Sequence, residues 1–171
     1  FKKIYGILDI GISRLDSNGN RIWTKTLGGT GINHAQNLFV SEDQQTITVL
    51  GWVNAGGGNL PGSYGGWDIV AAQYDAHGET RWITTLGSAE DDMTGSILSR
   101  GENVYLVYNS WVKGRNWEIK FVTLNTHGKI LHEKSYGGHG SELVHKVIPT
   151  PDGNFLILGS TDSIDTELGK S

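Results

Sequence analysis

The sequence contains no cysteine, only three prolines and no long run of apolar residues. The absence of cysteine excludes disulfide bonds and thiolate metal sites. The apolar stretches are only as long as a strand, so none could cross a membrane as a helix, and we expect no membrane insertion. Residues 1–5 lack the apolar core of a secretion signal, as a mature, processed chain also would.

A charge bias is missing as well. Charged residues make up 19% of the 171 residues, the formal net charge is -4, and acidic and basic residues are interspersed. No basic stripe is present, so the electrostatic footprint of a nucleic-acid-binding protein is absent. The length is sufficient for one ordinary domain with a sizeable core.

Glycine and tryptophan are abundant, with 25 and 6 copies. The glycines separate short runs of β-branched and aromatic residues, which is typical of all-β structure with many tight turns. No segment carries a convincing helical period.

An internal repeat dominates the sequence. Residues 9–29, 68–88 and 118–138 align without a gap. Each runs from an acidic residue through an alternating strand to Asp or Asn, then over two residues to Gly, a second strand and another Gly. The segments between them hold two more short strands each. One repeat of about 50 residues therefore supplies four strands, here termed A to D, which predicts an antiparallel four-stranded blade of a β-propeller.

The turn between strands C and D explains why the repeat is so visible. In residues 16–19, DSNG, the Asp side chain can accept backbone N–H groups, and Gly19 can supply a positive φ. The same turn recurs at 75–78 and 125–128. Trp23 and Trp82 follow the turn glycine by four residues, and we expect them to pack between adjacent blades.

The string LDSNGNRIWTKTLGG at 15–29, echoed at 74–88 and 124–138, resembles the bacterial and archaeal β-propeller repeat of cell-surface and secreted proteins. Residues 152–155 and 159–161 match a later element of that repeat. The resemblance implies blades of this kind and a secreted or cell-surface location in a prokaryote. It is specific for architecture and says little about function.

The phase of the repeat predicts an incomplete ring. Blades at about 34–86 and 92–136 are complete, and 1–29 and 142–161 are partial, so 1–171 is interpreted as a single β-propeller domain or a fragment with three to four blades' worth of strands. Residues 1–6 align with 132–137, which predicts a strand D there. Strands A and B of the next blade, about 40 residues, would then be absent between Gly6 and Ile7. Further chain segments or a second copy could complete the ring.

Functional residues of a propeller usually lie in the loops of one face, here the D–A and B–C connections. The candidate ligand-binding residues on that face are Trp52, Trp67, Asp68, Asp91, Asp92, Trp111, Trp117 and Glu118. The tryptophans could stack on sugar rings. The carboxylates could form a glycosidase-like pair or hold Ca²⁺, although an acidic residue repeated in every blade is expected to bind loop N–H groups. We expect no cofactor, with Ca²⁺ as the alternative.

No motif indicates a particular reaction. His34, His139 and His145 share no metal-ligand spacing, and no Ser/His/Asp set or nucleophile elbow is present. The sequence therefore predicts a non-catalytic extracellular or cell-surface module that binds a protein or a glycan at the loop face. One alternative is a hydrolase or lyase that uses Asp68, Asp91, Asp92 and Glu118 as acids. Another is a purely architectural repeat in a larger surface assembly.

Overall fold

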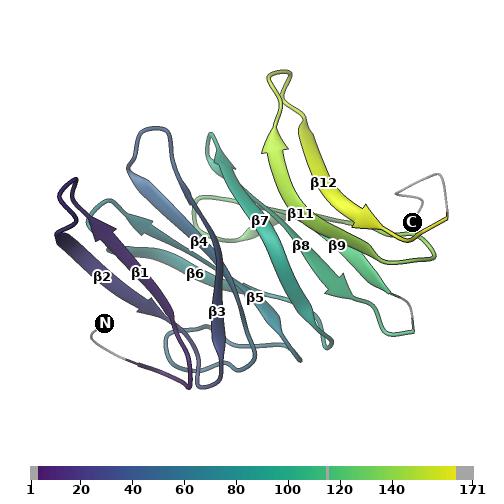
Figure 1. Cartoon of the computed structure of the whole chain (residues 1–171), viewed down its shortest axis with the longest axis horizontal. Helices are drawn as coiled ribbons and strands as arrows, with labels where there is room; N and C mark the ends of the chain where they lie inside the picture. Colours follow the sequence, from purple (N-terminus) through teal and green to yellow (C-terminus); the bar gives the residue numbers. More distant parts are fainter. Residues whose placement is uncertain (1–3, 115, 165–171) are drawn as a thin grey trace.

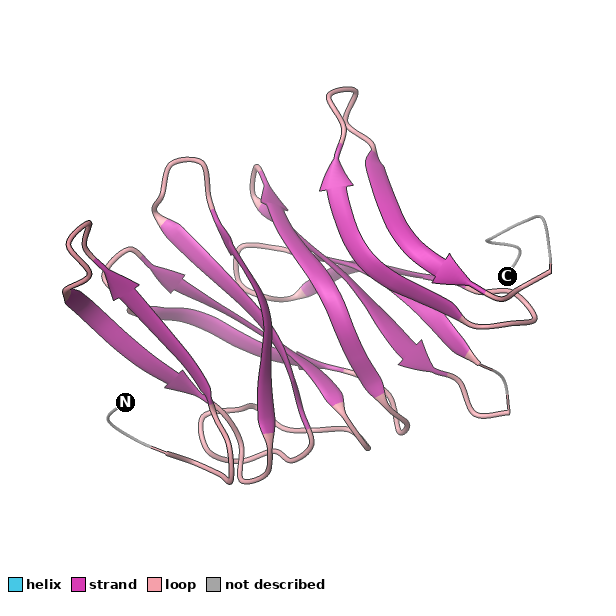
Figure 2. Cartoon of the chain, in the orientation of Figure 1, coloured by secondary structure: helices cyan, strands magenta, loops and turns pink. Residues whose placement is uncertain are grey.

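The structure is a computed structural model, and it describes residues 4–114 and 116–164. All regular secondary structure in these residues is β-strand, as Figure 2 shows. The described part of the chain therefore offers no helix that could pass through a membrane. The predicted all-β fold class is confirmed.

The strands form two four-stranded and two two-stranded antiparallel sheets. The first complete sheet contains β3 (Asn33–Val40), β4 (Thr46–Val53), β5 (Asp68–Asp75) and β6 (Thr80–Leu86). The second contains β7 (Asp92–Arg100), β8 (Asn103–Trp111), β9 (Trp117–Leu124) and β10 (Ile130–Tyr136). The two-stranded sheets are β1 (Ile10–Leu15) with β2 (Arg21–Leu27), and β11 (Glu142–Pro149) with β12 (Phe155–Thr161).

The sheets stand side by side in chain order, from β1–β2 at the purple end to β11–β12 at the yellow end (Figure 1). Within each complete sheet the strands follow the order A-B-C-D. Strand A is innermost, since β7 contacts both β3 and β11. The described strands thus form an open, propeller-like row of blades.

Each interface between neighbouring sheets is an apolar core. Ile12 and Val70 belong to the cluster between β1–β2 and the first complete sheet, and Leu50 and Leu106 to the next cluster. The central strands are buried on both faces in this way. In β5, for example, every residue except the last is buried. A blade packed between two neighbours needs apolar residues on both faces.

The predicted C–D turns and tryptophan wedges are confirmed. Asp16 Oδ1 accepts the backbone N–H groups of Asn18 and Asn20, and Gly19 has a φ of 82°. Trp82 lies against the turn of the next blade, because a β-carbon on Gly128 would approach its ring to 2.7 Å. Trp23 packs in the same way one blade earlier and donates Nε1–H to Ala76 O.

The predicted strand D over residues 1–6 is wrong for residues 4–6, the part that the structure describes. The first three of these residues lie outside the described part of the chain, and the other three form no strand. Instead, the Tyr5 backbone N–H donates to Asp9 Oδ2 at 2.6 Å. The backbone N–H of Tyr64 makes the equivalent bond, at 2.7 Å, to Asp68 Oδ2 at the first residue of β5.

This pairing places residues 5–9 in the connection that leads directly into strand C. The order of strands therefore needs no absent segment between Gly6 and Ile7, and the basis for that hypothesis is gone. The alignment failed because 1–6 shares Lys and Tyr-Gly with 132–137. The true counterpart, YGGWD at 64–68, is defined by a hydrogen bond to the aspartate rather than by more shared letters.

Candidate functional site

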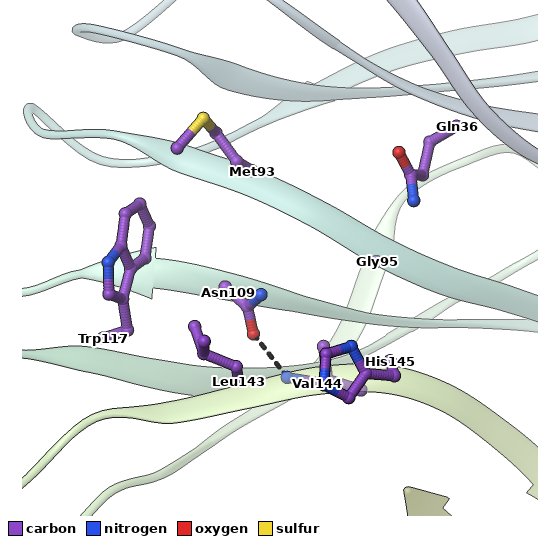
Figure 3. A pocket seen from close by; sticks show the side chains of 8 residues that line it. All are labelled: Gln36, Met93, Gly95, Asn109, Trp117, Leu143, Val144 and His145. Atoms are coloured by element: carbon purple, nitrogen blue, oxygen red, sulfur yellow. Dashed lines mark hydrogen bonds between the residues drawn. The ribbon is translucent and has the colours of Figure 1, made fainter. Parts of the chain in front are cut away.

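A pocket of about 340 Å³ lies where the innermost strands of three blades meet (Figure 3). Eight residues from β3, β7, β8, β9 and β11 line it, and these are Gln36, Met93, Gly95, Asn109, Trp117, Leu143, Val144 and His145. Its size lies at the lower end of the range of small-molecule sites.

The same repeat position enters this pocket from three successive blades. Strand A opens each time with a side chain that accepts the backbone N–H four residues earlier: Asn33 from Gly29, Asp92 from Ser88 and Glu142 from Gly138. Counting three residues onward from each gives Gln36, Gly95 and His145, and all three line the pocket. Three blades therefore meet at this pocket. At the position where they meet, the repeat holds three chemically different residues.

Strand A is irregularly paired at or beside this repeat position in all three blades. In β7 the shift lies between Met93 and Gly95, one residue before the equivalent position. The register of β3 with β4 shifts at Gln36, and that of β11 with β12 shifts at His145. A bulge leaves the extra residue unpaired and changes the direction of its side chain. His145 is exposed, and its Nε2 lies 2.9 Å from Ser160 Oγ on β12.

The walls of the pocket combine apolar and amide groups. Met93, Trp117 and Leu143 supply apolar surface. Asn109 Oδ1 accepts the backbone N–H of Val144 at 2.7 Å, drawn as the dashed line in Figure 3. This buried bond joins β8 to β11 across two blades and fixes the strand that carries His145.

The predicted carboxylates lie elsewhere, against loop backbone. Asp68 and Asp92 are fully buried, and burial raises the pKa of both carboxyls. Asp68 Oδ2 accepts the Tyr64 N–H, and Asp92 Oδ2 accepts the Ser88 N–H at 2.6 Å. Both carboxyls thus accept backbone N–H groups of the loops, as expected for acidic residues that recur in the repeat.

Asp91 and Glu118 also contact loop backbone. Asp91 Oδ1 accepts the Trp67 N–H at 3.0 Å. Glu118 lies beside Gly137, where an added β-carbon would approach Glu118 Cγ to 2.6 Å. Among the described residues, no group of three His, Asp or Glu side chains is placed to hold a metal ion. The expectation that no cofactor is bound stays a prediction.

The predicted tryptophans form two separate clusters. Trp52 and Trp67 pack with His34, with ring centroids 5.0 to 5.7 Å apart. Trp111 meets Trp117 edge to face at 5.4 Å. Of the eight predicted site residues, Trp117 lines the pocket between the inner strands.

The sequence did not point to the other lining residues. Gln36, Met93, Gly95 and Asn109 were not singled out, and His145 was noted only for lacking metal-ligand spacing. The signal that could have found them is the divergence of one repeat position, Gln36, Gly95 and His145, inside strands that otherwise align.

A family model for arylsulfotransferases (ASST) matches residues 64–171, which is more than half of the chain. The chain belongs to the arylsulfotransferase family. The match covers β5 to β12 and every pocket residue except Gln36. No curated protein is significantly similar to the chain in sequence.

Membership in the arylsulfotransferase family corrects the functional prediction. A non-catalytic binding module was expected, with an enzyme as the less favoured interpretation, and this is wrong because the family is one of enzymes. The reasoning failed because it searched for repeated carboxylates and known nucleophile motifs, and neither search addresses positions at which the repeat varies, such as Gln36, Gly95 and His145. The resemblance to a β-propeller-type repeat is supported at the level of the fold.

Proposed function

We propose that the pocket between the inner strands transfers a sulfuryl group between aryl oxygen atoms, with His145 as the reacting side chain. The observation that carries the proposal is the meeting of Gln36, Gly95 and His145 in one pocket within the family-matched part of the chain. His145 is the titratable residue of the lining.

The reaction requires one proton to move. An aryl sulfate donor loses its S–O(aryl) bond, and the sulfur forms a bond to the oxygen of an acceptor phenol. The acceptor releases its proton, and the departing phenolate takes one up. An imidazole can accept and return this proton, or it can attack the sulfur and hold the sulfuryl group covalently. The contact with Ser160 Oγ orients the His145 ring for either role.

The pocket lining supports an aromatic substrate. Trp117 offers an aromatic face, and Met93 adds a polarisable thioether that packs well against rings. Asn109 and Gln36 contribute amide groups to the lining. An apolar wall with few polar groups suits a phenol more closely than it suits a heavily hydroxylated sugar.

The test is an assay of sulfuryl transfer from 4-nitrophenyl sulfate to phenol. The release of nitrophenol and the formation of the sulfated product are both measured. We expect His145→Ala to lower the rate by about 100-fold or more. His132→Ala is the matched control, because His132 is exposed on β10 and lies outside the pocket lining. A wild-type protein inactive with all aryl sulfates, or a fully active His145→Ala variant, would overturn the proposal.

Rapid mixing separates the two roles of the histidine. A burst of nitrophenol equal to the enzyme concentration, before acceptor is added, indicates a sulfuryl group on the protein. Release that begins only with acceptor indicates a proton-transfer role. Either result requires His145.

We also propose a secreted or cell-surface setting without a nucleic-acid partner. The proposal is supported by the resemblance of 15–29 to the surface-protein repeat and by interspersed charge. Fractionation of the producing cells, with an antibody against the chain, tests it. Recovery in the cytoplasm alone would refute it.

A further inference from the structure

A second pocket, of about 640 Å³, lies between β2 and the turn that joins β5 to β6. The described linings of this pocket and of the candidate active site have no residue in common. Most of its lining residues are polar, and the charged or titratable ones are Arg21, Lys25, His77 and Glu79. Basic side chains therefore outnumber acidic ones in the described lining, and such a surface attracts anions.

Tyr74 brings a buried hydroxyl group to this pocket. The residue is 1% exposed, and its hydroxyl has no hydrogen-bond partner among the described residues. A buried polar group without a partner is unfavourable, and native proteins retain few of them. Burial, together with the neighbouring Tyr5, raises the pKa of Tyr74 to about 12. The hydroxyl therefore keeps its proton and needs an acceptor, which an oxyanion supplies.

The next junction between blades shows that packing does not require this hydroxyl. At the equivalent repeat position, Leu124 replaces Tyr74 and is fully buried. Two threonines, Thr80 and Thr84, hold the positions of the two cationic residues of β2. The tight turn and the tryptophan wedge are common to both junctions. The hydroxyl and the two cations are thus additions at one junction, and packing alone does not account for them.

We propose that this pocket binds a tetrahedral oxyanion, a sulfate or phosphate group, through Tyr74, Lys25 and Arg21. The guanidinium of an arginine presents paired N–H groups that match adjacent oxygens of such an anion. Lys25 Nζ already lies 3.2 Å from Glu79 Oε1, but Glu79 is 77% exposed, and an ion pair in solvent is weak. The ammonium group has further N–H donors for a second acceptor. The inference is independent of His145 and of sulfuryl transfer.

Titration of the full chain with sodium sulfate and with sodium phosphate, at constant ionic strength, tests the proposal. The readout is the NMR signal of the Trp23 indole N–H, because Trp23 lines the pocket and donates Nε1–H to Ala76 O. We expect a saturable shift with both oxyanions and none with chloride. A shift with one of the two supports the proposal and identifies the group. If neither gives a saturable shift, the proposal is overturned.

Tyr74→Phe removes the hydroxyl and keeps the ring, and the buried Leu124 shows that the fold accepts an apolar residue at this position. We expect it to weaken oxyanion binding about 10-fold, the value of one hydrogen bond to a charged group. The matched control is Tyr108→Phe, since Tyr108 is also buried but lies outside this pocket. Equal affinity in Tyr74→Phe and the wild type would overturn the proposal.

Lys25→Gln tests the charge, and its control is Lys120→Gln. The control breaks a comparable ion pair, with Glu133 at 3.1 Å, outside this pocket. We expect weaker oxyanion binding in Lys25→Gln and unchanged binding in Lys120→Gln. Urea unfolding gives a second measurement, because a ligand stabilises the folded state that binds it. Sulfate also stabilises proteins in general, so the measured quantity is the extra gain of the wild type over Tyr74→Phe. An identical gain in both proteins would contradict the site.

Discussion

Asn33 donates a side-chain N–H to Asp9 Oδ1 at 3.0 Å, and one repeat later the same two positions hold Asp92 and Asp68. The second pair has two carboxyls where the first has a carboxyl and an amide donor. A β-carbon on Gly87 would clash with Asp68 Oδ1 and lie 3.1 Å from Asp92 Oδ2, so both oxygens face the same small space. Asp68 Oδ1 is buried without a hydrogen-bond partner among the described residues.

We predict that this pair of buried carboxyls retains a proton in the folded state. Burial raises the pKa of Asp68 and of Asp92. A carboxyl whose pKa is higher in the folded state than in the unfolded state favours folding while it is protonated, and this contribution is lost as the pH rises from 3.8 through the folded-state pKa. Asp92→Asn should reduce this loss, because an amide donor replaces the proton, as Asn33 does beside Asp9. We expect a gain of roughly 1–2 kcal/mol in the free energy of unfolding at neutral pH, and a smaller one near pH 4.

Urea unfolding of both proteins at a series of pH values measures this difference. Exposed carboxyls with a lowered pKa, such as Asp16 and Asp75, act in the opposite direction, since their contribution is lost as the pH falls below 3.8. They are common to both proteins and cancel in the comparison. Parallel pH curves for the wild type and Asp92→Asn would contradict the shared proton.

Substitutions at two turn glycines allow the cost of backbone strain to be measured separately from the cost of disturbed packing between blades. Gly19 and Gly128 both have a positive φ, 82° and 73°, but only Gly128 faces a neighbour, the ring of Trp82. Gly19→Ala should therefore cost about 1 kcal/mol of stability through strain alone. Gly128→Ala should cost about 1–3 kcal/mol more, because its β-carbon would overlap the indole. Equal losses in urea unfolding would mean that Trp82 moves aside freely.

The parts of the fold that sequence predicts are those fixed locally. The Asp16 turn closes within five residues, and the wedge of Trp82 follows from its fixed distance to that turn. The pocket depends instead on three chain segments that are about 50 residues apart in sequence, so no local pattern marks His145. Tyr5 and Gly6 were misplaced for a related reason, since the role of this segment is defined by the Tyr5 hydrogen bond to Asp9.

Trp117 provides a test of the aryl-binding wall. Trp67 precedes β5 as Trp117 precedes the acidic residue of β9, but it packs against His34 and Trp52 rather than in the pocket. Trp117→Leu should raise the KM for the aryl donor by about 3- to 10-fold, the value of one aromatic contact, with a smaller change in kcat. Trp67→Leu should leave KM unchanged. The opposite order of effects would place the aryl ring at the first cluster.

Asn109 should affect catalysis by positioning the strand that carries His145, since its Oδ1 accepts the N–H of the neighbouring Val144. Asn109→Ala leaves that buried N–H without its acceptor, which costs about 1–3 kcal/mol, and it frees β11 to shift relative to β8. We expect a lower kcat for sulfuryl transfer together with faster hydrogen exchange at the Val144 amide. Asn109→Asp keeps an acceptor oxygen and should restore slow exchange and most of the rate. If Asn109→Ala slows the reaction while the Val144 amide remains protected, Asn109 contacts the substrate instead of positioning the strand.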